Sequence, residues 1–140
     1  MTKTTEQIRT DYRDGILIPV LLAAGAVVLM GTFAVVNTAG YAVTSDAVGG
    51  ADQTVVGIWV DDAVNPGPDG TAHALVRRNK QFLVANSATD PVEQADLGQL
   101  VYVADNQTVA KTDNAGVLPV AGTFMGFDLE NPTYVWVEIV

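Results

Sequence analysis

Hydrophobic residues in this chain fall into short valine-rich blocks, and glycine, asparagine and aspartate separate one block from the next. Residues 32–43 predict a strand, a turn and a strand, and residues 99–111 repeat that arrangement with Asp105 and Asn106 in the turn. Residues 53–60 and 120–127 each predict a strand with an internal glycine, which often marks a bulge or a close backbone approach. An acidic loop and a further strand, at 71–78 and 134–140, follow each of them.

The two halves therefore share one order: hairpin, linker, glycine-containing strand, acidic loop, strand. A duplicated β unit and common turn chemistry both account for this order. Since no long amphipathic helix pattern is present, we expect an all-β fold, a small antiparallel β-barrel or sandwich with an internal pseudo-repeat as one interpretation. Residues 15–140 would form a single β domain and residues 1–14 an extended polar N-terminal arm. One helical turn is expected after Asp90 as N-cap, with Pro91 at the first helical position.

The longest uncharged run, between Asp14 and Asp46, has a second interpretation. Residues 16–36 are long enough for a membrane helix, which needs about 20 apolar residues, and Arg13 precedes them as in a signal anchor. Pro19, the internal glycines and the many valines favour strands instead. The rest of the chain has the same pattern, so we expect strands here and no membrane partner.

The C-terminal residues 134–140 alternate along a strand. Val135, Val137 and Ile139 are expected to face the core. The opposite face carries Tyr134 and Trp136, and two aromatic side chains beside a lone carboxylate suit a subunit interface. We therefore predict Tyr134 and Trp136 as oligomer-interface residues.

Charge narrows the classes of partner. The formal net charge is −9, which argues against general nucleic-acid binding because that needs basic residues to neutralise phosphates. The chain has no cysteine, so disulfides and thiolate metal sites are excluded. After Arg13 the next basic residues are Arg77, Arg78 and Lys80. They form either a solvated strand end or a small basic patch that pairs with carboxylates on a partner.

Candidate catalytic residues are few. The serines are Ser45 and Ser87, both in turn-like surroundings, and the single histidine, His73, is expected to be half-exposed on a strand. The acidic loop at 61–70 lacks the alternating acids and closing glutamate of a calcium loop. No phosphate-binding or dinucleotide fingerprint is present. We therefore expect no enzyme activity, no cofactor and no metal.

Several stretches resemble the small capsid cement, or head decoration, proteins of tailed bacteriophages. They are YRDGILIPVLLAAGAVVLMGTFAVVNTAGYAV, VVGIWVDDAVN, RRNKQFLVANSATDPVEQADLGQLVYVADNQTVAKT and the closing VAGTFMGFDLENPTYVWVEI. The resemblance covers the chain from about Tyr12 to the end, and it lies in overall pattern because none of these stretches is a catalytic motif.

The resemblance implies a β-barrel-like virion protein on the outer surface of the expanded icosahedral head. Such a protein would bind the major capsid protein and itself, as a homotrimer or alternatively a dimer. For capsid contact it points to the arm and the basic segment: Ile8, Asp11, Tyr12, Arg13, Asp14, Arg77, Arg78 and Lys80. Two other functions stay open: another phage structural part, such as a tail-tube or head–tail connector piece, and a membrane-anchored β domain with residues 16–36 in the bilayer.

Overall fold

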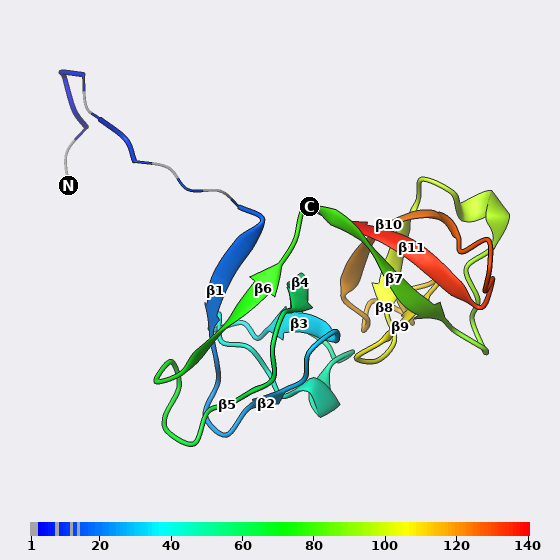
Figure 1. Cartoon of the computed structure of the whole chain (residues 1–140), viewed down its shortest axis with the longest axis horizontal. Coiled ribbons are helices and arrows are strands. Elements are labelled where there is room, and N and C mark those ends of the chain that lie inside the picture. The colour runs from blue at the N-terminus through cyan, green and yellow to red at the C-terminus, as the bar shows by residue number, and fades with distance from the viewer. Residues whose placement is uncertain (1–2, 8, 12, 14) are drawn as a thin grey trace.

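The structure, a computed structural model, describes residues 3–7, 9–11, 13 and 15–140 (Figure 1). Apart from two short 3₁₀ turns, the regular elements of this part of the chain are strands. The strands are β1 (Leu17–Leu21), β2 (Val27–Val28), β3 (Phe33–Val36), β4 (Thr54–Trp59), β5 (Ala63–Val64), β6 (His73–Arg77), β7 (Lys80–Asn86), β8 (Leu100–Val103), β9 (Thr108–Ala110), β10 (Val120–Phe127) and β11 (Tyr134–Ile139). The turns are η1 (Ser45–Ala47) and η2 (Gln94–Asp96). The all-β prediction is confirmed.

The first half of the chain forms an antiparallel sheet in the order β1–β6–β4–β3, called here the N-terminal sheet. Ala42 bridges its two edges, because it pairs antiparallel with Val36 at the end of β3 and parallel with Leu22 after β1. The sheet therefore curls towards closure. A two-stranded ribbon, β2–β5, lies at the end of this half away from the arm (Figure 1).

The second half forms a closed barrel in the order β10–β11–β7–β9–β8, called here the C-terminal barrel. Its neighbouring strands are antiparallel except for β7 and β9, which pair in parallel and close the barrel. Closure leaves this barrel without a free edge on which another strand could add.

The two halves have the same connectivity. Each half is a ring of five neighbouring segments that a parallel contact closes. In the N-terminal sheet the order is Ala42, β3, β4, β6, β1, and in the barrel the matching order is β9, β8, β10, β11, β7. Gly57 in β4 corresponds to Gly122 in β10: a Cβ at either position would overlap a main-chain oxygen of the next strand, on Arg77 or on Glu138. Such a matched constraint argues for a duplicated unit over chance turn chemistry.

Two apolar cores follow from this arrangement. One fills the N-terminal sheet and includes Trp59, Val76 and Leu22, and the other fills the barrel and includes Phe124, Val101 and Val137. Three further members of the barrel core come from the N-terminal sheet: Phe33, Val35 and Ile58. Since successive strand residues point to opposite faces, β3 is buried on both sides. The outer side of β3 and β4 thus joins the two halves.

Several sequence predictions can be checked directly. Residues 16–36 contribute β1, β2 and β3, and within the described residues no helix is long and apolar enough to cross a membrane. Val135, Val137 and Ile139 are buried as expected. The helical turn after Asp90 was placed wrongly: the turn is η2, with Glu93 as its N-cap in a capping box with Asp96. Asp90 cannot cap it, because its carboxylate accepts hydrogen bonds from Thr112 instead.

Candidate interaction surfaces

The acidic loop at 61–70 is held in place by one buried asparagine. The Asn65 side chain donates to the main-chain oxygens of Leu22 (3.0 Å), Ala23 (3.2 Å) and Pro68 (3.0 Å). Its Oδ1 accepts from the Gly67 N–H at 3.0 Å and the Thr71 hydroxyl at 2.9 Å. Asp69 and Asp62 also accept hydrogen bonds, from the main-chain N–H groups of Ala24 (2.7 Å) and Met30 (2.8 Å). The loop therefore clamps the chain between β1 and β3, a structural role for its polar groups.

The residues considered for hydrolytic chemistry lie on separate elements. Ser45 is buried, and its Oγ accepts from the Leu29 N–H at 3.1 Å. Ser87 accepts from the N–H groups of Thr89 and Asp90 in a turn. His73 lies on a strand, β6, as expected, and it is exposed where half-exposure was expected. Among the described residues, no group of three or more histidine, cysteine, aspartate or glutamate side chains could hold a metal ion.

The basic segment lies at the root of the N-terminal arm. The Arg78 N–H donates to the main-chain oxygen of Ile16 at 2.9 Å, and Leu17 pairs with Arg77 across β1 and β6. The Asn79 N–H donates to the Ile139 oxygen at 2.7 Å, so the end of β11 also meets this point. The fold thus brings Arg77 and Arg78 next to the root of the arm, and Lys80 lies just beyond them at the start of β7, paired with Ile139.

The arm itself leads away from the body in its described part (Figure 1). Asp11 and Arg13 are exposed, and Arg9 pairs with Asp11 at 3.5 Å with both side chains more than nine-tenths exposed. Such an exposed pair contributes little stability. Ile8, Tyr12 and Asp14, the other predicted capsid contacts in the arm, lie outside the described residues.

The remaining basic residue of the body, Lys111, belongs to an ion cluster on the barrel. Its Nζ lies 3.3 Å from Glu93 Oε2 and 4.0 Å from Asp96 Oδ2. The hydrogen bond that Lys111 donates to Glu93, and then the charge of Asp96, raise the pKa of Lys111. Nearby, hydrogen bonds from the hydroxyl and N–H of Thr112 lower the pKa of Asp90. Lys111 is therefore engaged within its own chain.

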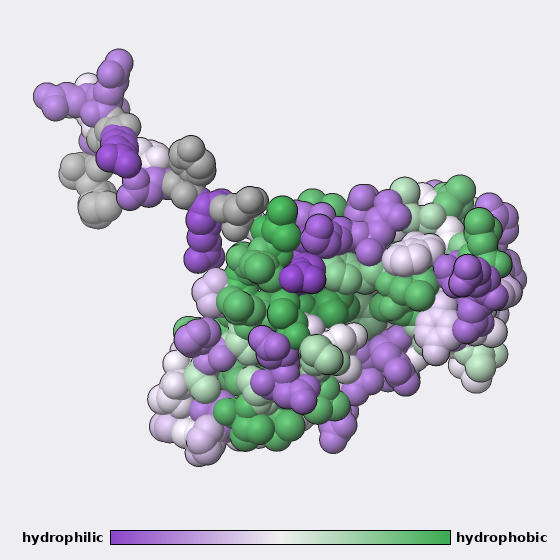
Figure 2. Space-filling view, in the orientation of Figure 1, coloured by the Kyte–Doolittle hydropathy of each residue, from purple (hydrophilic) through white to green (hydrophobic). Residues whose placement is uncertain are grey.

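Tyr134 and Trp136 lie on the outer face of β11, as the alternation predicts. Tyr134 is exposed and Trp136 is half-buried, opposite Ala85 and Leu83 of β7. The corresponding face of the N-terminal sheet, on β1 and β6, carries the exposed side chains of Leu17, Leu21 and Leu75. Apolar side chains gather over β1 and β6 in Figure 2.

One apolar surface was not predicted. It lies on the outer side of β8 and β10, where Leu100 is 53% exposed, Val120 45% and Met125 39%. In the sequence these residues alternate with the core positions, and alternation alone does not say whether an outward apolar residue meets a neighbour or solvent.

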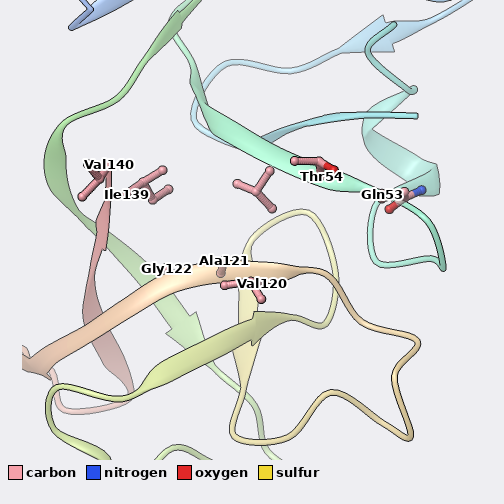
Figure 3. A pocket seen from close by; sticks show the side chains of 8 residues that line it. Gln53, Thr54, Val120, Ala121, Gly122, Ile139 and Val140 are labelled. Carbon is pink, nitrogen blue, oxygen red and sulfur yellow. The ribbon is translucent and has the colours of Figure 1, made fainter. Parts of the chain in front are cut away.

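A cleft of about 370 Å³ lies between the two halves (Figure 3). Gln53, Thr54 and Val55 line it from the N-terminal sheet. The barrel supplies Val120, Ala121, Gly122, Ile139 and Val140. It borders the contact made by the outer side of β3 and β4, near the point where β6 ends and the chain continues into β7 of the barrel.

Comparison of the chain with protein-family models, with curated proteins and with solved structures found no match.

Proposed function

We propose that this chain is a structural virion protein that binds the outer surface of the expanded icosahedral head of a tailed phage and cements neighbouring major capsid subunits. The observation that carries the proposal is the position of the arm. It leads away from the body, its root lies against Arg77 and Arg78, and Lys80 follows them at the start of β7. An acidic protein thus presents an extended segment and its basic residues at one end, a combination suited to a large partner surface.

A cement protein needs a large contact area with the capsid that is repeated at many sites, and it does not need an active site. A homo-oligomer that touches several capsid subunits gains affinity through effective concentration, so modest contacts suffice. A protein that binds only the expanded lattice stabilises that state by its differential affinity. The proposed contacts on the capsid are Ile8, Asp11, Tyr12, Arg13, Asp14, Arg77, Arg78 and Lys80, and the proposed subunit contact contains Tyr134 and Trp136.

The test is co-sedimentation with expanded heads of the encoding phage from which decoration has been stripped. The full chain should sediment with the heads, and a chain lacking residues 1–14 should stay in the supernatant with an unchanged oligomeric mass. If the full chain does not bind expanded heads, the proposed function is wrong. If the truncated chain binds the heads as well as the full chain does, the arm is not part of the capsid contact. Leu129→Glu, at a side chain 97% exposed in the loop between β10 and β11, is the matched control and should bind normally.

A further inference from the structure

The contact between the two halves uses one side of the N-terminal sheet. Phe33 and Val35 on β3 are fully buried, and Ile58 on β4 is 8% exposed, all within the barrel core. The Phe33 N–H donates to the Asn106 oxygen at 3.0 Å. At Gly49 an added Cβ would lie 2.7 Å from the Ala104 oxygen, so the backbones touch there. The turn between β8 and β9 at this end of the barrel therefore receives the outer side of β3 and β4.

The same positions on the barrel are exposed or half-buried, and of them Val120 also borders the cleft between the two halves. In the registers of the two halves, the pair Phe33–Ile58 corresponds to Leu100–Thr123, and the pair Val35–Val55 corresponds to Tyr102–Val120. We call Leu100, Tyr102, Val120, Thr123 and Met125 the β8–β10 face. Leu100, at the position of the fully buried Phe33, is 53% exposed. An apolar surface is thus buried in one unit and open in its duplicate.

Duplication also indicates what would cover this face. Within the chain, the N-terminal sheet packs on the end of the C-terminal barrel that carries the turn between β8 and β9. The equivalent end of the N-terminal sheet carries the turn at residues 37–40, whose Thr38, Ala39 and Gly40 are exposed. A second copy could seat its β8–β10 face there, since the contact would repeat one the fold already makes.

Charge favours this pairing. Arg77 on β6 occupies the position that Glu138 occupies on β11, because Arg77 pairs with Ile58 and Glu138 pairs with Thr123. Arg78 lies at the arm-bearing end of the N-terminal sheet, where its N–H donates to the Ile16 oxygen, whereas Asp128 directly follows β10 at the edge of the β8–β10 face. Opposite charges would therefore meet around an apolar centre.

We propose that the β8–β10 face of one copy binds the arm-bearing end of the N-terminal sheet of a second copy, repeating between chains the contact that joins the two halves. This inference rests on the homo-oligomer part of the proposed function. The two surfaces differ, so the interface is heterologous, and successive copies close into a ring when the rotation between them permits. The N-terminal sheets and C-terminal barrels alternate around it.

The test uses two variants that each damage one side. Leu100→Glu places a carboxylate on the β8–β10 face, and Ala39→Glu places one on the receiving turn. Each should weaken self-association by at least about tenfold, because an unpaired carboxylate would be buried against apolar or acidic neighbours. By light scattering on a sizing column, the wild type should exceed the 14.7 kDa of one chain and each variant should run as a monomer. Met125→Glu serves as a second face variant if Leu100→Glu does not fold.

The decisive sample is an equimolar mixture of the two variants. The Ala39→Glu variant keeps an intact β8–β10 face, and the Leu100→Glu variant keeps an intact receiving end. The mixture should therefore form a dimer of one copy of each variant, and this dimer should grow no further. A monomeric wild type, a variant that keeps the wild-type mass, or a mixture that stays monomeric would overturn the proposal. Leu129→Glu should keep the wild-type mass. Tyr134→Ser distinguishes the two candidate contacts between copies: it keeps the wild-type mass if the β8–β10 face is the contact, whereas a monomeric Tyr134→Ser would place the contact on the Tyr134–Trp136 face and overturn the proposal. Head binding is assayed separately, so a failed interface and a failed proposed function give different results.

Discussion

Asn65 offers the sharpest stability prediction. It is fully buried, and its side chain serves five main-chain or hydroxyl partners across two segments of the chain. Asn65→Ala would remove all of these hydrogen bonds at once. The main-chain oxygen of Leu22 would then lose this partner inside the protein, whereas groups nearer the loop surface could be rehydrated.

The cost can be estimated from the partners. A net hydrogen bond contributes about 0.5–1.5 kcal/mol, and a buried group left without a partner costs about 1–3 kcal/mol. With partial rehydration of the loop, we expect Asn65→Ala to lower the free energy of unfolding by about 3–5 kcal/mol. For a chain of this size that corresponds to a fall in Tm of about 10–17 °C.

Urea and thermal unfolding followed by circular dichroism would measure this change. Asn65→Asp keeps the acceptor oxygen but replaces the donor with a carboxylate facing main-chain oxygens, so it should cost at least as much as alanine. Asp61→Asn, at an exposed residue of the same loop, is the control and should stay within about 0.5 kcal/mol of the wild type. A loss below about 1 kcal/mol for Asn65→Ala would refute the assignment of Asn65 as the clamp of this loop.

Two further predictions concern the repeat and the pH dependence. Gly57→Ala and Gly122→Ala should each lower the free energy of unfolding by about 1–3 kcal/mol because the new methyl overlaps a neighbouring strand. Gly15→Ala, whose nearest neighbour would be 3.6 Å away, should be near neutral in the same urea titration, and equal costs at all three sites would contradict the close approach. The pKa of Asp90 is lowered in the folded state, so its stabilising effect is present above the unfolded value of about 3.9 and is lost as pH falls through the lower folded pKa. Asp90→Asn should therefore differ from wild type in unfolding free energy at pH 6 and approach it in strong acid, and a pH-independent difference would argue against the charge.

The sequence was most informative where structure depends on neighbouring residues. Alternation in residues 134–140 placed Val135, Val137 and Ile139 in the core, since the side-chain period of a strand is two. The predicted hairpin at 99–111 and both glycine-containing strands are present, because turn residues and apolar blocks act over a few positions. At 32–43 only the first strand forms, and the returning segment pairs with it through the single bridge of Ala42 with Val36. The order of these elements already suggested a duplicated unit.

The tertiary structure alone decided how those elements meet. The parallel contact of Leu22 with Ala42 joins segments that no local pattern connects, and so does the hydrogen bond from Phe33 to Asn106. The position of the helical turn was missed for the same reason: Asp90 is a good N-cap locally, but Thr112 from a distant segment takes its carboxylate. Phe33 and Leu100 hold equivalent positions, yet one is buried and the other exposed. Strand periodicity sets which way a side chain points, and only the packing of the two halves sets what it meets.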